Sequence, residues 1–362
     1  MWKADDVIPA GNKDGSDKGT PVLVTGAAGF VGSHVSRAIL RAGRKVVATD
    51  LAAALPAHVT AGLDLQPPRY VRGDLLEDDV LSSILHECGG ALDVVHTAAV
   101  IRFSQLAGSL GEARPAGQDF LRSFAVNAST PCLLGVRLHE AGVLRRFVHV
   151  STRAVFGGGP PSADPVGEDE PLRPAGVYGS SKAAGELGLL ALRDQFGLDL
   201  RIARITGVFG PYQGPVSFIG QAADAVLAGK PYDVAAGGDD AYELTYVKDT
   251  VRGLVMLLSA EHPAHTYYHV ASGSTTTLRE VASAFARAEP AAQVDFGSGH
   301  DAGASGRAPL QVQRAEAELG FTARWALDEA LRDYLEVERS GDYGTEAFDP
   351  PNTPVLATDE GS

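Results

Sequence analysis

The chain has 362 residues, of which 44% are hydrophobic and 21% charged, a balance typical of a soluble globular protein with room for two lobes. Its formal net charge of -14 disfavours binding to nucleic acid or to an anionic membrane, because both are negatively charged. The two cysteines and ten histidines show no disulfide or zinc-binding spacing, so we expect no metal site and a reducing, cytoplasmic setting.

Both ends of the chain are predicted to be flexible tails. Residues 1–19 are polar and lack the apolar core of a signal peptide, and residues 341–362 are similarly polar. No apolar run between them reaches the length that is needed to span a bilayer.

The first structured segment, PVLVTGAAGFVGSHVSRAILRAGRKVVATD, has the order strand, glycine turn, helix, strand, acid. The turn contains Gly26, Gly29 and Gly32, and the second strand ends at Asp50. Such glycines let the backbone approach a pyrophosphate at the helix N-terminus, and the acid can accept hydrogen bonds from a ribose. The segment predicts dinucleotide binding; the alternative is a glycine-rich turn in an unrelated α/β protein.

Strand-like and helix-like segments alternate after this unit. The strand-like runs end near Asp74, Ala98, Thr152 and Thr206, and the helix-like segments span 80–87, 130–141 and 180–195. This alternation predicts an α/β fold with a doubly wound parallel (Rossmann) sheet. Ligands of such sheets bind at the carboxyl ends of the strands, where these residues fall.

An ordered set of motifs resembles the NAD-dependent extended short-chain dehydrogenases/reductases of the sugar epimerase/dehydratase type. The motifs are TGAAGFVG (25–32), GDL (73–75), HTAAV (96–100), Asn127, VSTRAVFG (150–157), YGSSK (178–182), GVFGP (207–211) and YVKD (246–249). The similarity extends from about residue 21 to about residue 338. It implies NAD as cofactor, a sugar-like small-molecule substrate and a homodimer.

The resemblance also implies a set of cofactor-cleft residues. Besides the three glycines, Asp50, Tyr178 and Lys182, the set contains Phe30, Asp74, Leu75, Ala98, Ala99 and Asn127. Asp74 and Asn127 have an alternative role, since each precedes an expected helix and could cap it. Asp50 favours NAD over NADP, because a 2′-phosphate would face like-charge repulsion there.

The stretch VYGSSK places Tyr178 and Lys182 four residues apart at the start of a helix, so that both face one way. Hydride transfer at a secondary alcohol needs a group that takes the hydroxyl proton. A nearby ammonium and a cationic nicotinamide favour tyrosinate by lowering the pKa of Tyr178. Thr152 would orient the substrate oxygen, which makes Thr152, Tyr178 and Lys182 the predicted catalytic residues. The alternatives are a packed tyrosine and a solvated lysine.

The residues after Thr152 bear on the reaction type. In dehydratases of the resembling family an acidic pair stands there and supplies the acid and base for water loss, whereas this chain has Arg153 and Ala154. Dehydration is therefore disfavoured.

Candidate substrate residues come next, beginning with Arg153 itself. Thr206 and Tyr242 stand where related epimerases often have Asn and Arg, which weakens the case for a diphosphate substrate. Arg307 is a candidate replacement. Arg204 lies on a buried strand and is either a substrate contact or a partner in an internal ion pair.

We expect two lobes and three possible function classes. Residues 20–205, with a return at 244–258, form the NAD-binding lobe, and residues 206–243 and 270–338 form the substrate lobe; the segments 103–122 and 156–176 border the cleft. The preferred function is a sugar epimerase, with a net dehydrogenase or reductase and a non-catalytic NAD-binding scaffold as alternatives.

Overall fold

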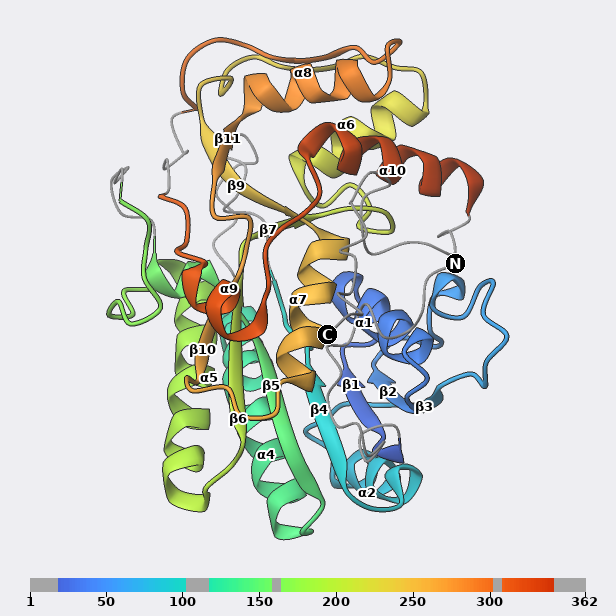
Figure 1. Cartoon of the computed structure of the whole chain (residues 1–362), viewed down its shortest axis with the longest axis vertical. Coiled ribbons are helices and arrows are strands. Elements are labelled where there is room, and N and C mark those ends of the chain that lie inside the picture. The colour runs from blue at the N-terminus through green and yellow to red at the C-terminus, as the bar shows by residue number, and fades with distance from the viewer. Residues whose placement is uncertain (1–18, 102–116, 158–163, 302–307, 342–362) are drawn as a thin grey trace, which may run out of the picture.

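A seven-stranded parallel sheet forms the centre of the protein (Figure 1). The computed structural model describes residues 19–101, 117–157, 164–301 and 308–341, so both tails and parts of the segments 103–122 and 156–176 lie outside it. The strand order is β10-β6-β5-β4-β1-β2-β3. The strands are β1 (Val22–Thr25), β2 (Val46–Asp50), β3 (Arg69–Arg72), β4 (Leu92–His96), β5 (Leu144–Thr152), β6 (Leu200–Ile205) and β10 (Tyr267–Val270). The predicted doubly wound α/β fold is confirmed.

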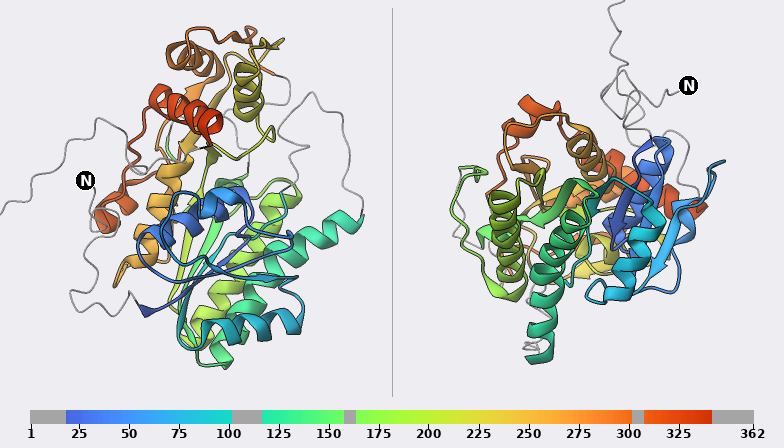
Figure 2. Two further views of the ribbon diagram at one scale, coloured as in Figure 1. Left: turned by 90° about the vertical axis from the view of Figure 1, so that its right-hand side faces the viewer. Right: turned by 90° about the horizontal axis from the view of Figure 1, so that it is seen from below.

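Helices cover both faces of this sheet (Figures 1 and 2). One face packs on α1 (Phe30–Arg41) and α7 (Val247–Ser259). The other packs on α2 (Asp78–Cys88), α4 (Thr130–Glu140) and α5 (Gly176–Phe196), with α3 (Gly117–Phe124) beside α5. Alternate strand residues point to opposite faces, so Val22 and Val24 join the first core while Leu23 joins the second.

A smaller lobe stands above the carboxyl ends of the strands (Figure 1). It contains a sheet of β11 (Thr275–Thr277), β9 (Ala241–Tyr246) and β7 (Gly207–Phe209), and a pair of strands, β12 (Val294–Phe296) and β8 (Tyr232–Val234). Its helices are α6 (Phe218–Leu227), α8 (Leu278–Ala288) and α10 (Leu327–Ser340).

Two strand placements were not expected from the sequence. The run 199–211 contains two strands of different sheets, because the chain leaves the large sheet after Ile205 and enters the small one at Gly207. Strand β10 adds to the edge of the large sheet, and α9 (Gln313–Leu319) packs against β10 and α7. Part of the range 270–338 therefore supports the nucleotide-binding sheet.

The strand order reverses between β1 and β4, which lie side by side at the middle of the sheet. From β1 the chain proceeds to β2 and β3 on one side, and from β4 to β5 and β6 on the other. In an open α/β sheet this arrangement creates a crevice outside the carboxyl ends of the two central strands. The fold therefore directs a ligand to the turns that follow β1 and β4.

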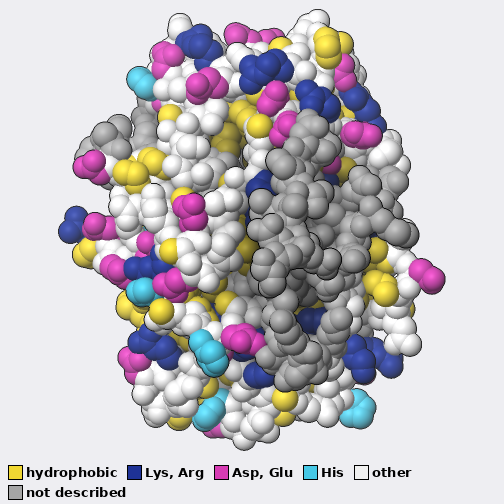
Figure 3. Space-filling view, in the orientation of Figure 1, with side chains coloured by type: hydrophobic (Ala, Val, Ile, Leu, Met, Phe, Trp, Pro, Cys, Tyr) yellow, Lys and Arg dark blue, Asp and Glu magenta, His cyan; other side chains and the backbone are white. Residues whose placement is uncertain are grey.

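On the face in Figure 3, acidic and basic side chains of the described residues are interspersed. Within the described ranges, no helix is long and apolar enough to cross a bilayer.

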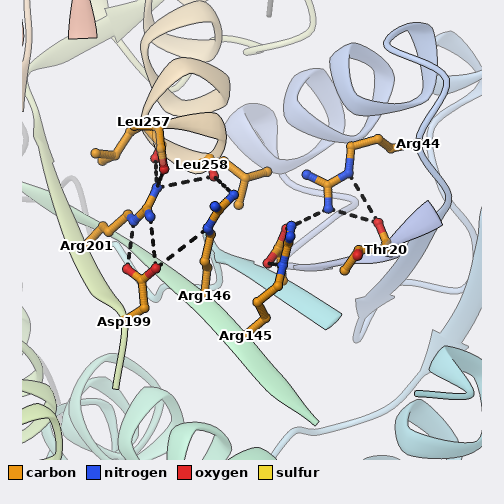
Figure 4. A network of polar contacts seen from close by, with 10 residues as sticks. Thr20, Arg44, Arg145, Arg146, Asp199, Arg201, Leu257 and Leu258 are labelled. Atoms are coloured by element: carbon orange, nitrogen blue, oxygen red, sulfur yellow. Dashed lines mark hydrogen bonds and ion pairs between the residues drawn. The ribbon is translucent and has the colours of Figure 1, made fainter. Parts of the chain in front are cut away.

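The amino ends of the strands carry a network of buried arginines (Figure 4). The Asp93 carboxylate is fully buried and accepts hydrogen bonds from Arg44 at 2.6 Å and Arg145 at 2.5 Å. Arg201, 1% exposed, donates to the carbonyls of Leu257 and Ala260 at 2.6 Å each. These carbonyls lie at the C-terminus of α7, where backbone acceptors lack helical partners and a cation is favourable. The network anchors α7 and the lower ends of the central strands.

Asp93→Ala should lower the free energy of unfolding by about 3–5 kcal/mol, because it leaves the Arg44 guanidinium buried without a counter-charge. Urea unfolding followed by circular dichroism measures this change. The matched control is Asp78→Ala, which removes a carboxylate that is 76% exposed and pairs with Arg137; its cost should stay below about 1 kcal/mol. Equal losses in the two variants would contradict the assigned role of Asp93.

Candidate active site

The turn between β1 and α1 tolerates no side chain at two of its glycines. Gly26 has φ of 65°, and a Cβ atom there would lie 2.7 Å from the backbone of Ala98. A Cβ atom on Gly32 would lie 2.1 Å from the carbonyl oxygen of Gly26. Helix α1 begins after Gly29 without a side-chain cap. Its first N–H groups are therefore available to an anion, as in a pyrophosphate site.

Asp50 ends β2 beside this turn. Its Oδ2 accepts a hydrogen bond from the backbone N–H of Ala28 at 2.9 Å, and its Oδ1 accepts from Ala52 at 3.1 Å. The carboxylate thus holds the glycine turn from the neighbouring strand. A close-packed glycine turn, an uncapped helix N-terminus and a carboxylate next to them fit a dinucleotide.

The GDL motif forms a turn after β3. Asp74 Oδ1 accepts from the N–H of Leu76 at 3.1 Å, while α2 begins only at Asp78 with Glu77 before it. The N-cap position of α2 is Glu77, three residues after Asp74, so the alternative that Asp74 caps this helix is wrong. Leu75 is buried and Ala98 is half-buried, and both pack in the core that covers the α5 side of the sheet.

Asn127 lies fully buried in a π-helical turn, Ala125–Ser129. Its amide clamps the backbone of Val100: Oδ1 accepts from Val100 N at 2.8 Å, and Nδ2 donates to Val100 O at 3.0 Å. Nδ2 also donates to Ser181 Oγ at 3.0 Å. The side chain ties the segment after β4 to α5 and does not cap α4, so the geometry favours the predicted support of the backbone.

Thr152, Tyr178 and Lys182 converge at the carboxyl end of β5. Thr152 is the last residue of β5, Tyr178 lies in the first turn of α5, and the Thr152 side chain is close enough to the Tyr178 hydroxyl to lower its pKa. The adjacent Gly179 permits this contact, because a Cβ atom there would lie 2.5 Å from the carbonyl oxygen of Ala154. Lys182 is 1% exposed, and its Nζ donates to the carbonyl of Val150 at 2.7 Å.

The protonation of Tyr178 differs from the expectation. Burial raises the pKa of Tyr178 to about 12, and the hydrogen bond from Thr152 opposes this only in part. Burial lowers the pKa of Lys182 to about 8, against the opposing charge of Glu186. The Lys182 ammonium donates to the carbonyl of Val150 and lies beside His149. The protein alone therefore keeps the phenol protonated, as a general acid requires.

Arg204 takes the ion-pair alternative. Its guanidinium is 2% exposed and meets the fully buried Glu186 carboxylate at 2.7 Å. A further donor reaches the carbonyl of Glu168 at 2.6 Å. With these contacts Arg204 joins α5 to β6 and to the loop before α5, and the geometry does not direct it to a substrate.

The other predicted substrate residues in the described ranges lie on different elements and contact protein groups. Arg153 is 8% exposed and donates to the carbonyl of Ala308 at 2.9 Å. Thr206 Oγ1 lies 2.8 Å from Thr245 Oγ1, and the Tyr242 ring lies 5.2 Å from that of Phe218. Arg307 lies outside the described residues.

One backbone pairing closes the rim on this side. Val166 N donates to Pro309 O at 2.8 Å, and Gln311 N donates to Val166 O at 2.9 Å. The loop before α5 is thereby joined to the segment that precedes α9. This contact is consistent with the expectation that the segment 156–176 borders the cleft.

Two residues of the site were not singled out from the sequence. Glu186 follows Lys182 by four residues, so the spacing 178, 182, 186 places all three side chains on one face of α5. His149 precedes Thr152 by three residues in β5, and its Nε2 lies 3.3 Å from Lys182 Nζ. In the described ranges, no three His, Cys, Asp or Glu side chains are grouped to hold a metal ion.

Comparisons with known proteins agree with this geometry. The profile of the NAD dependent epimerase/dehydratase family matches residues 22–271. A dTDP-glucose 4,6-dehydratase of Streptomyces niveus is 30% identical over 328 residues, covering 87% of this chain and 91% of that protein. A UDP-glucose 4-epimerase of Mycolicibacterium smegmatis is 30% identical over 324 residues, covering 88% and 98%. The structure of MoeE5 in complex with UDP-glucuronic acid and NAD is 30% identical, with a TM-score of 0.72 over 90% of this chain and all of that chain.

Gly32→Ala should weaken NAD binding at least about tenfold, because its Cβ atom would push the Gly26 carbonyl and displace the turn. Isothermal titration calorimetry measures the affinity. Gly135→Ala is the matched control, since a Cβ atom there would lie 3.8 Å from Leu189, at ordinary contact distance. Wild-type affinity in Gly32→Ala would refute this use of the turn.

Proposed function

Because the chain belongs to the NAD-dependent epimerase/dehydratase family of extended short-chain dehydrogenases/reductases, we propose that it epimerises a hydroxyl-bearing carbon of a nucleotide-linked sugar. The observation that carries this proposal is the placement of Thr152, at the carboxyl end of β5, close to Tyr178 in the first turn of α5, on the same edge of the sheet as the glycine turn. A hydroxyl acid and its orienting partner at this position suit reversible oxidation of a secondary alcohol.

In the proposed reaction each residue of the site has one task. Bound NAD supplies the acceptor, and later the donor, of a hydride. Thr152 orients the substrate oxygen, and Tyr178 exchanges a proton with it in both directions. Lys182 holds a buried positive charge one turn along α5 and binds the cofactor ribose. Asp50, whose carboxylate lies beside the glycine turn, favours a cofactor without a 2′-phosphate.

The residues after Thr152 favour epimerisation over dehydration. Water loss needs an acid and a base at the next carbon, and Arg153 and Ala154 offer no carboxylate in the 3-10 turn Arg153–Phe156. Arg153 is in addition engaged with the carbonyl of Ala308. The curated relatives include dehydratases and an epimerase at the same identity, so identity does not decide between the two reactions.

The nucleotide moiety is supported by the relatives and has to be bound differently here. MoeE5 was crystallised with UDP-glucuronic acid and with UDP-glucose. In this chain the two positions hold the uncharged side chains of Thr206 and Tyr242, which contact Thr245 and Phe218. Arg153, which directly follows Thr152, is a cation that could bind the diphosphate instead.

We also propose a homodimer formed through α3 and α5, in a reducing cytoplasmic setting. Phe120 and Leu121 on α3 are 45% and 68% exposed, and Leu187 and Phe196 on α5 are 58% and 37% exposed. The two helices contact each other. Large apolar side chains gathered on two adjacent helices favour burial against a second copy. Both cysteines are free thiols, in keeping with that compartment.

Leu187→Asp should convert the dimer to a monomer, because a carboxylate would be buried without a partner. Light scattering coupled to size-exclusion chromatography measures the mass. Leu65→Asp, at a residue that is 47% exposed and away from both helices, is the control and should leave the mass unchanged. A wild-type protein of monomer mass would refute the dimer.

The reaction itself is tested by mass balance on substrate deuterated at the reacting carbon. A panel of nucleotide sugars is incubated with the enzyme and NAD, and followed by NMR and by absorbance of reduced cofactor. An epimerase yields an isomer of equal mass with deuterium retained and no free NADH. One NADH per substrate, together with a ketone, lactone or acid, would replace the proposal with a net dehydrogenase.

Tyr178→Phe is the matched variant for this experiment. Turnover should fall roughly a hundredfold or more, because the proton-transfer group is lost. The fold and the affinity for NAD should persist, since the phenol hydroxyl contacts Thr152 and no backbone group of the glycine turn. Near-normal turnover would remove Tyr178 from its assigned role.

A further inference from the structure

The fully buried side chain of His149 lies beside Lys182 and has no role in the reaction described above. We propose that His149 is a positioning residue: its neutral imidazole accepts a hydrogen bond from the Lys182 ammonium and holds that charge under the cofactor cleft. This inference rests on the proposed function, because it concerns a residue that function uses.

The first support is a change from apolar to polar side chains along one face of the sheet. On the face covered by α5, the lower parts of three neighbouring strands contribute apolar residues to the core: Leu23, Val94 and Phe147. Two residues later the same face carries a polar row, paired in register across β1, β4 and β5: Thr25, His96 and His149. Lys182 descends from α5 onto the end of this row. Histidine at 149 thus belongs to a polar layer below the catalytic level.

The second support is the set of acceptors around the ammonium. Lys182 Nζ donates to the carbonyl of Val150 at 2.7 Å and lies 3.3 Å from His149 Nε2. Glu186 is the carboxylate on the same face of α5, but it pairs with Arg204 at 2.7 Å and also accepts from Ser151. In the described part of the chain no carboxylate lies within ion-pair distance of Lys182. His149 is therefore the side-chain acceptor that the ammonium meets.

The state of the imidazole follows from its burial. Burial, and then the charge of Lys182, lowers the pKa of His149 well below its ordinary value, so the ring is neutral. A neutral imidazole has one acceptor nitrogen, and acceptance at Nε2 requires the proton on Nδ1. The ring stacks on His96 with centroids 5.5 Å apart and planes 18° apart. His96, likewise kept neutral by burial, and Glu186 are the other titratable groups whose charge interacts with Lys182.

The consequence concerns the pH range in which Lys182 stays charged. Burial lowers the pKa of Lys182 to about 8, and a hydrogen bond to the charged form opposes that shift. Removal of the acceptor should lower the pKa of Lys182 further. The ammonium would then be lost at a lower pH, and NAD binding would weaken from the alkaline side.

The test follows the titration of Lys182 directly, by NMR of lysine labelled with ¹³C at Cε. The chain has seven lysines, and Lys182→Met identifies the signal. His149→Phe should lower the pKa of Lys182 by about one unit, the scale of a charge-assisted hydrogen bond. His149→Gln, which restores an acceptor oxygen, should return it to within about 0.3 unit. His96→Phe is the matched control from the same row and should also stay within about 0.3 unit.

Calorimetric titration of NAD at pH 8 gives a second measure. The affinity of His149→Phe should fall about fivefold, and His149→Gln should keep the wild-type value within about twofold. A Lys182 pKa and an NAD affinity that do not change in His149→Phe would overturn the proposal. Circular dichroism shows whether each variant is folded.

A measurement on the wild-type protein covers the case in which His149→Phe does not fold. Long-range ¹H–¹⁵N spectra distinguish the two neutral tautomers of a histidine ring, and the missing signal of His149→Gln assigns the residue. The Nδ1–H tautomer supports the proposal, and an Nε2–H tautomer overturns it, since that nitrogen could not accept. None of these readings needs a substrate, so an absence of epimerase activity would count against the proposed function alone.

Discussion

The buried Glu186 carboxylate is the interaction on which the catalytic end of the sheet depends. It joins three elements, because it accepts from Arg204 of β6 and Ser151 of β5 while it stands on α5. A buried carboxylate is stable only with partners that compensate its desolvation, so each element constrains the other two. Lys182 lies one turn earlier on α5. The negative charge of Glu186 raises the pKa of Lys182, although Glu186 forms its ion pair with Arg204. The distance between α5 and the ends of β5 and β6 is thereby set, and with it the contact of Tyr178 with Thr152.

The two ends of the parallel sheet use buried charge for different purposes. At the amino ends, Asp93 and Arg201 meet partners that complete their hydrogen bonding and anchor α7 and the lower strands. At the carboxyl ends, Lys182 has no carboxylate partner among the described residues. Its ammonium donates to a carbonyl and lies beside a neutral imidazole ring. Complete pairing gives rigidity, whereas an incompletely compensated cation keeps donors for a ligand. This division agrees with the rule that ligands of α/β sheets bind beyond the carboxyl ends of the strands.

Features that depend on neighbouring residues could be predicted from the sequence, whereas features that depend on contacts between distant residues could not. The glycine turn, Asp50 and the spacing of Tyr178 and Lys182 are local signals, and the fold places them where local geometry directs them. Glu186 and His149 acquire their roles through contacts 18 and 33 residues away along the chain, which no local pattern reveals. The same holds for the strand that divides at Thr206 and for β10, which joins the large sheet from beyond α7. The pKa of Tyr178 was expected to fall because of the nearby ammonium and the cationic nicotinamide, and the sequence does not show how strongly burial raises that pKa.

Departures from the resembling family gather where the two lobes meet. The cofactor side keeps the glycines and the acid of the turn, whereas Arg153 follows β5, Thr206 follows β6 and Tyr242 lies on β9 of the small sheet. A reaction that passes hydride out and back needs its oxidised sugar retained, so the rim must hold the ligand while the reacting ring turns over. The pairing of Val166 with the segment 309–311 closes one side of that rim with backbone hydrogen bonds, which do not depend on side-chain identity. Substitutions of side chains near this pairing can therefore change which sugar is accepted while the backbone hydrogen bonds are kept. Epimerisation depends on these bonds because they help to retain the oxidised sugar.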